Sequence, residues 1–419
     1  MASSEEKASY RNLVSFWIFG ICCNYSYSVM ITGAQDILSK QEKNVTAVRS
    51  IEHCETELLD RHCSPYSASL VLLCNILPGF VAKLIYPFTT KFIPYGVRHA
   101  IVCILQAASL LIVAFANSVP IALLGVSVGS IQSGLGESTY LGLASHYPKS
   151  AISTWSSGTG MAGLAGAFSY AGLTDSRLLG FSSMEAMLIT LIVPFIFLVT
   201  YYTLLVVPDT VRKAELRKPI TWIGLDVVLE KRKPSIEREE PPRRTCKEKL
   251  AIFKSLLKYM IPLFTVYFAE YLINQGLVEL IVFDCDHGFG TSISGQYRWY
   301  QVLYQVGVFI SRSSASFVQL NMTWLVILPI IQLLNSVFFL MDSIFNFVPY
   351  FGIIAAIVLA EGLIGGASYV NSYNHIHKKI DPTIREFALS IVTLADTAGI
   401  FVAALVGMPI HNAICKLPL

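Results

Sequence analysis

The chain has 419 residues, of which 54% are hydrophobic and 14% are charged, with 31 basic and 28 acidic side chains. Soluble globular proteins have about 25% charged residues, so this composition excludes a soluble enzyme and indicates a protein embedded in a lipid bilayer. Outside one charged segment, too few basic residues remain to form a surface that neutralises phosphates. We therefore expect no nucleic acid among the partners of this protein.

Hydrophobic segments of about 20 residues, the length at which a helix crosses a bilayer, occur in two groups along the chain. The first group lies at 12–37, 66–90, 97–116, 119–145, 151–173 and 184–207. The second group lies at 256–283, 297–316, 323–345, 349–374 and 386–412. The sequence thus predicts an all-α polytopic membrane protein with about 11 transmembrane helices, six in the first group and five in the second.

A charged, proline-containing segment at 208–250 separates the two groups. We predict a six-helix bundle at 1–207, a cytosolic linker at 208–250 and a five-helix bundle at 251–419. Two bundles around a central path are typical of major facilitator transporters. The simpler explanation for the basic residues of the linker is that they hold it in the cytosol. Binding of cytosolic trafficking partners is the alternative.

The distribution of Lys and Arg between the ends of the spans predicts a cytosolic N-terminus. Loop 38–65 then lies in a lumen, where Asn44 in the sequence Asn44-Val45-Thr46 is an acceptor for N-glycosylation. Cys54 and Cys63 share this loop and either form a disulfide or remain as two free thiols.

Several polar side chains occur at membrane depth, where each is costly unless it is paired or hydrated. They either line a wet path for a polar substrate or hold helices together in a buried network, and we favour the path. Lys83 and Arg312 lie near predicted cytosolic helix ends, where snorkelling is the ordinary explanation, although Lys83 could face inward. The candidate path residues are Asn24, Tyr27, Lys83, Glu137, Glu270, Asn274, Gln275, Glu361, Tyr369, Asn371 and Asp396.

The sequence contains no motif of a serine hydrolase, a zinc protease or a phosphate-binding loop. Its nine cysteines show no metal-ligand spacing. We therefore predict neither an enzyme nor a bound cofactor or metal. Glycines recur at close spacing at 158–166 and at Gly362 and Gly366, and we interpret them as sites where helix backbones approach closely.

Several segments are similar to the battenin family of lysosomal membrane proteins, which includes the protein of Batten disease. The similarity covers nearly all predicted spans and is weakest in the linker and the first lumenal loop. The segments that carry it are 15–38, 133–137, 153–160, 267–277, 296–301, 311–314, 361–363 and 369–371. Members of this family can end in a prenylation box, but here Cys415 stands fifth from the end, so we do not expect prenylation.

The resemblance implies a major-facilitator-like protein of the lysosomal or late-endosomal membrane, with a distant relation to equilibrative nucleoside transporters. It implies a transporter that exports small polar metabolites, with glycerophosphodiesters favoured, and so supports lysosomal pH, basic amino-acid homeostasis and autophagic clearance. Two alternatives remain: a non-transporting scaffold in endosome–lysosome trafficking, and a regulator of the proton pump.

A phosphodiester needs cationic or amide donors, which Lys83, Asn24, Asn274 and Gln275 provide. A choline head group needs an aromatic face and a carboxylate. Proton coupling is a further hypothesis: Glu137, Glu270 and Glu361 would take up a proton in an acidic lumen and release it to the cytosol. Alternatively, these glutamates accept hydrogen bonds from Asn274, Tyr271 or Tyr369 and only hold helices together.

Overall fold

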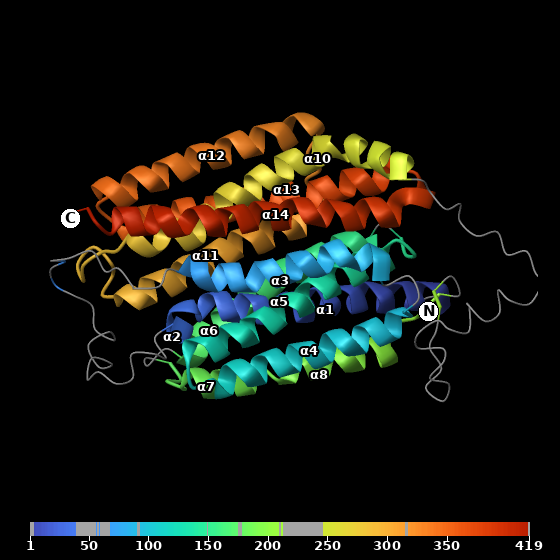
Figure 1. Ribbon diagram of the computed structural model, residues 1–419, viewed down its shortest axis with the longest axis horizontal. Coiled ribbons are helices and arrows are strands. Elements are labelled where there is room, and N and C mark those ends of the chain that lie inside the picture. The colour runs from blue at the N-terminus through green and yellow to red at the C-terminus, as the bar shows by residue number, and fades with distance from the viewer. Residues whose placement is uncertain are drawn as a thin grey trace, which may run out of the picture.

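The computed structural model describes residues 4–38, 56, 58, 68–89, 93–148, 150–174, 178–208, 211–212, 246–314 and 317–417. Within these residues all regular structure is helical, and the long helices run side by side along one direction (Figure 1). The predicted fold class, an all-α polytopic membrane protein, is therefore confirmed.

The N-terminal half, here the helices of residues 4–208, supplies six membrane-length elements. The last of them is a chain of three short helices, α7, α8 and η3. The bounds are α1 Ser4–Thr32, α2 Ala34–Leu38, α3 Ala68–Thr89, α4 Tyr95–Phe115, α5 Val119–Ala144, α6 Ser150–Thr174, α7 Ser183–Ile189, α8 Ile192–Val199 and η3 Thr200–Leu204.

The C-terminal half, here the helices of residues 246–417, supplies five membrane-length elements. In the first of them a π-helical turn, η5, and a 3₁₀ turn, η6, follow α10. The bounds are α10 Cys246–Leu272, η5 Ile273–Leu277, η6 Val278–Leu280, α11 Ile293–Ser313, α12 Met322–Phe345, α13 Phe351–Lys379 and α14 Pro382–Ile414.

Nine helices of the described residues are long and apolar enough to cross a membrane by length and composition. The remaining two membrane-length helices are α6, which is rich in Gly, Ser and Thr, and α11, which carries Gln, Tyr and Arg side chains. These two helices pack against each other. Their polarity follows from this position, because a helix between two bundles faces neighbouring helices more than lipid.

Within the N-terminal half, α1 packs on α6, and α5 packs on both α3 and α4. Within the C-terminal half, α10 packs on α14 and α12, and α11 packs on α13. The two halves meet mainly through α6 with α11 and α3 with α14 (Figure 1). Residues 246–250 belong to α10 rather than to the linker predicted at 208–250. The division of the chain into bundles at 1–207 and 251–419 remains a prediction.

The glycines interpreted as close-packing sites do lie at tight helix crossings. A Cβ atom on Gly158 would lie 2.2 Å from the carbonyl oxygen of Trp17, where α6 crosses α1. A Cβ atom on Gly362 would lie 2.2 Å from the carbonyl oxygen of Tyr304, where α13 crosses α11. Both distances are far shorter than a van der Waals contact, so only glycine fits these crossings, and the interpretation is confirmed.

Two cysteines in the described residues, Cys285 and Cys415, are disulfide-bonded. Asn44, Cys54 and Cys63, nearly all of loop 38–65 and most of the linker lie outside the described residues.

Candidate functional site

A cavity of about 90 Å³ lies at the junction of the two halves. Side chains from α1, α3, α5 and α6 line one part of it, and side chains from α10, α11, α13 and α14 line the other. A volume of this size holds roughly six to nine water molecules. The candidate path residues that line it are Asn24, Tyr27, Lys83, Glu137, Tyr369 and Asp396.

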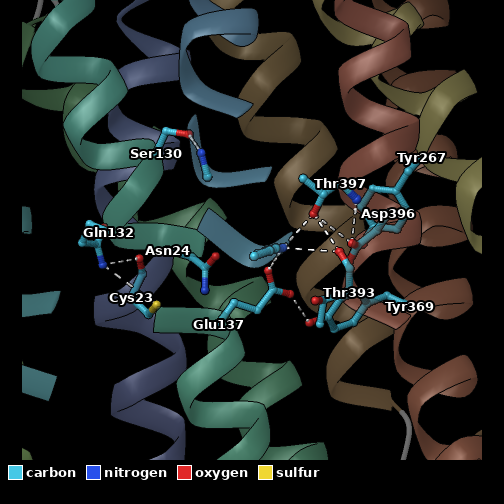
Figure 2. Close-up of polar contacts among 12 residues, drawn as sticks. Cys23, Asn24, Ser130, Gln132, Glu137, Tyr267, Tyr369, Thr393, Asp396 and Thr397 are labelled. Atoms are coloured by element: carbon cyan, nitrogen blue, oxygen red, sulfur yellow. Dashed lines mark hydrogen bonds and ion pairs between the residues drawn. The ribbon is translucent and has the colours of Figure 1, made fainter. Parts of the chain in front are cut away.

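Lys83 is the centre of a polar cluster that joins four helices. Its Nζ donates to Oε2 of Glu137 at 2.5 Å, to Oγ1 of Thr397 at 2.7 Å and to the carbonyl oxygen of Thr393 at 3.5 Å. The hydroxyl of Tyr369 donates to the other oxygen of Glu137 at 3.1 Å (Figure 2). The cluster therefore connects α3 and α5 of the N-terminal half with α13 and α14 of the C-terminal half.

Asp396 lies beside this cluster and lines the same cavity. Its Oδ1 accepts from the backbone N–H of Thr397 at 2.6 Å and from Oγ1 of the same residue at 3.2 Å (Figure 2). Because Thr397 also accepts from Lys83, this threonine connects the carboxylate to the ammonium group. The side of the cavity formed by α3 and α14 therefore contains an ion pair and a neighbouring carboxylate.

Arg312 also lines the cavity, although the sequence-based set of candidates did not include it. Its Nη1 donates to Oγ1 of Thr159 at 2.6 Å, and its Nη2 donates to the hydroxyl of Tyr267 at 2.9 Å. Its Cζ lies 4.2 Å from the centre of the Tyr369 ring, a cation–π distance.

The snorkelling explanation is wrong for both Lys83 and Arg312. Lys83 is only 7% exposed, and both side chains point into the junction of the halves instead of towards a membrane surface. The sequence does contain a signal for this position of Arg312. The helix that carries it, α11, is too polar to face lipid, so a charged residue in its last turn is expected to face inward.

Glu270 and Glu361 form a second group, inside the C-terminal half and away from the main cavity. Glu270 accepts from the hydroxyl of Tyr304, and Glu361 accepts from Nδ2 of Asn274 at 3.0 Å. The same Nδ2 donates to the backbone carbonyl oxygen of Glu270 at 3.0 Å. The second carboxylate oxygen of each glutamate is buried without a hydrogen-bond partner.

The π-helical turn η5 places Asn274 and Gln275 in this second group. Such turns inside helices are frequent at functional sites. Nε2 of Gln275 donates to Gln301 at 3.3 Å, and Gln275 lines a cavity of about 10 Å³ that holds roughly one water. Tyr27 and Tyr271 line both cavities. A polar connection therefore runs from the main cavity towards Glu270.

Asn371 lines neither cavity and belongs to neither of the two polar groups. Its Oδ1 accepts from the backbone N–H of Leu320 at 3.0 Å, and its Nδ2 donates to the carbonyl oxygen of Ala367 at 2.9 Å. These contacts fix the residues before α12 to α13, so the geometry gives Asn371 a structural role.

Contacts between the halves also occur at the end of the bundle that carries α2 and the end of α14 (Figure 1). Nη2 of Arg298 lies 3.4 Å from Oδ1 of Asp36. Oε2 of Glu279 accepts from the backbone N–H of Ala68, the first residue of α3, at 3.1 Å. The hydroxyl of Ser69 donates to the carbonyl oxygen of Gln275 at 2.8 Å. These contacts close that end of the junction.

Across the part of the chain that the structure describes, no group of three or more His, Cys, Asp or Glu side chains is placed to hold a metal ion.

Two helical halves that meet around a charged cavity, all within membrane-length helices, define the class of the protein: it has the fold of a major facilitator transporter. The solved structure of the human organic anion transporter MFSD10 (TETRAN) superposes with a TM-score of 0.62 at 11% sequence identity, covering 99% of this chain and 97% of that one. At this identity the likeness shows the fold alone.

The family is shown by sequence. The family model of the CLN3 protein matches residues 14–417. The chain is 39% identical over 428 residues to Battenin of Canis lupus familiaris, covering 99% of this chain and 94% of that protein. It is 34% identical over 419 residues to Protein BTN1 of Eremothecium gossypii, covering 96% of this chain and 94% of that one. The chain therefore belongs to the CLN3 family, and the resemblance to battenin is confirmed.

Proposed function

We propose that the protein is a transporter that exports small polar metabolites across the lysosomal or late-endosomal membrane, with glycerophosphodiesters as the favoured class. The observation that carries this proposal is the charged cavity at the junction of the halves, where side chains from both halves meet. Membership of the CLN3 family and the major facilitator fold support it. In that fold, a site between two halves is exposed to each side in turn as the halves rock.

The chemistry of the cavity suits a zwitterionic phosphodiester. Asn24 provides amide donors for phosphate oxygens, and the cationic groups provide charge. Aromatic faces of Tyr27 and Tyr369, together with the carboxylates of Glu137 and Asp396, suit a quaternary ammonium head group.

Proton coupling belongs to the same proposal. Glu137 lies in the cavity. Glu270 accepts from Tyr304, which lines the smaller cavity, and Asn274 links Glu270 to Glu361. Buried carboxylate oxygens without a hydrogen-bond donor are most stable when they carry a proton. A proton taken up in an acidic lumen and released to the cytosol would therefore drive export of the substrate.

The test is flux of radiolabelled glycerophosphocholine through the purified protein in liposomes with an acidic interior and a neutral exterior. We expect saturable flux above that of empty liposomes, and the same flux when a Gly-Ser linker of equal length replaces residues 213–245. A purified protein that moves neither glycerophosphodiesters nor basic amino acids contradicts the proposal. If a cellular function is then lost when the native linker is replaced, the non-transporting scaffold is favoured instead.

The proposed orientation has a cytosolic N-terminus, a cytosolic linker at 208–250 and a glycosylated Asn44 in the lumen. It is supported by disulfide-bonded Cys285 and Cys415, since disulfides form in oxidising compartments. The prediction is that Asn44→Gln abolishes the gel shift that a glycosidase produces with the natural chain. An unchanged shift contradicts this orientation.

A further inference from the structure

Four charged side chains line the main cavity: Lys83, Glu137, Arg312 and Asp396. Lys83 and Glu137 form an ion pair, and Thr397 connects Asp396 to the same ammonium group. For Arg312, by contrast, no carboxylate oxygen of the described residues lies within the 4.0 Å of an ion pair. Within the described residues Arg312 therefore forms no ion pair, and Glu270, which does not line the cavity, attracts it from a longer distance.

The direct contacts of Arg312 hold its guanidinium in place and include no carboxylate. Thr159 and Tyr267 each accept one N–H, and the ring of Tyr369 lies against its face. Its Nε is buried and has no hydrogen-bond partner. Since a guanidinium has five N–H donors, one N–H on each terminal nitrogen remains for a ligand. The fork is preorganised for an oxyanion, which arginine binds through two parallel hydrogen bonds.

Lys83, which the sequence favoured as the phosphate-binding cation, is already fully engaged. An ammonium group has three N–H donors, and Glu137, Thr397 and Thr393 accept all three. An anion could bind Lys83 only by displacing one of these acceptors. Arg312 demands no such exchange.

We propose that Arg312 is the anion-recognition residue of the cavity and that the site accepts a single negative charge. A phosphodiester, which is a monoanion, fits this site. A phosphomonoester, which is a dianion at neutral pH, brings a second charge that would face the carboxylates of Glu137 and Asp396 across the same cavity. The hydroxyl of Tyr267 accepts from Arg312 and keeps its own O–H as a further donor. This assignment rests on the proposed transport function and names the residue that selects its substrates.

The experiment compares Arg312→Gln and Arg312→Lys with the natural chain, and Arg98→Gln is the matched control. Arg98 also donates to a tyrosine hydroxyl, that of Tyr86 at 2.7 Å, and lies 4.4 Å from the ring of Tyr95, but it does not line the cavity. The probes are glycerophosphocholine and glycerol 3-phosphate. Binding is measured by ligand-induced thermal stabilisation of the purified protein, and flux is measured in liposomes.

We expect Arg312→Gln to weaken glycerophosphocholine binding by about 10- to 100-fold, the range for hydrogen bonds to a charged group. Arg312→Lys keeps the charge and is therefore the safer variant for folding, and it should still weaken binding about 10-fold because an ammonium group lacks the planar fork. Arg98→Gln should bind within about twofold of the natural chain.

The preference for a single negative charge is tested in the natural chain by the ratio of glycerol 3-phosphate affinity to glycerophosphocholine affinity. This ratio should rise by about 10-fold or more between pH 7.5 and pH 5, because the monoester gains a proton near pH 6 and becomes a monoanion. A constant ratio overturns this preference.

The failures of the two proposals are distinguishable. A natural chain that moves the probe, with Arg312 variants of unchanged affinity, overturns the role of Arg312 and leaves transport standing. A natural chain that neither binds nor moves any probe overturns the transport proposal itself.

Discussion

Glu137 and Asp396 lie at the junction of the two halves beside Lys83, whereas Glu270 and Glu361 lie inside the C-terminal half. The hydrogen bonds to the first pair come from α3, α13 and α14, and they include an ammonium group. The donors to the second pair are an amide and a phenol from the C-terminal half itself.

The two pairs of carboxylates therefore differ in whether their hydrogen-bond partners must change when the two halves move. When two halves rock about a central site, contacts across the junction are remade, while contacts within one half move as a unit. The ion pair of Lys83 and Glu137 is within the N-terminal half, but Thr397 and Tyr369 of the other half complete it. We infer that the junction cluster changes during transport and that the Glu270–Glu361 group stays intact.

The largest expected effect comes from removing the cation of the junction cluster. Lys83→Met leaves the part-buried Glu137 without its counter-charge, which should destabilise the protein by up to about 3–5 kcal/mol. The double variant Lys83→Met/Glu137→Gln should recover much of this loss, because no uncompensated charge of the pair remains. Thermal unfolding of the purified protein measures both, with the exposed Lys258→Met as the control. Additive effects of the two changes contradict the ion pair.

The next effect concerns the helix crossing beside the second carboxylate group. A Cβ atom at Gly362 would meet the carbonyl oxygen of Tyr304 at 2.2 Å, so Gly362→Ala must push α13 from α11. We expect a loss of about 1–3 kcal/mol, as for overpacked cores. Gly352→Ala in the same helix is the control, because its nearest neighbour would be the Phe289 ring at 3.6 Å. Equal unfolding temperatures for the two variants contradict the close crossing.

Glutamine substitutions separate the two carboxylate groups further. Glu270→Gln and Glu361→Gln should unfold within about 1.5 kcal/mol of the natural chain, because neither removes a member of an ion pair. Glu137→Gln should cost more, because Lys83 loses an ion-pair partner. Flux against lumenal pH then tests coupling: the variant at the proton site should have a flattened profile while folding normally. If all three variants keep the natural pH profile, none of these glutamates is the proton site.

The smallest effect lies outside the membrane-spanning segments, in the loop before α11. The backbone N–H and imidazole of His287 hold the pKa of Asp284 below its ordinary value. A lowered pKa stabilises the fold at pH values above the unfolded pKa, about 3.9, and the gain is lost as pH falls through the folded pKa. Asp284→Asn should therefore lower the unfolding temperature slightly, by about 2 °C or less, at about pH 5.

Below the lowered pKa of folded Asp284 the difference between Asp284→Asn and the natural chain should vanish, since both then lack the carboxylate charge. The neighbouring, exposed Asp286→Asn is the matched control and should show no such pH dependence. A difference that grows as pH falls contradicts the assigned sign.

The sequence by itself determined the number and approximate bounds of the membrane-length helices. Their length follows from the thickness of the bilayer, and hydrophobic composition reports it directly. The tight crossings at Gly158 and Gly362 were also predictable, because close helix packing in membranes demands small residues at fixed spacing. Family membership followed from segments distributed over nearly all spans.

Only the tertiary structure decided which polar side chains share a site. The rotation of each helix about its own axis sets where a side chain points, and packing against neighbouring helices sets that rotation. It brought Arg312 into the cavity, separated Glu270 and Glu361 from it, and turned Asn371 to the residues before α12. Hydrophobic length fixes the position of a residue along the membrane normal, but its direction around the helix depends on partners far away in the sequence.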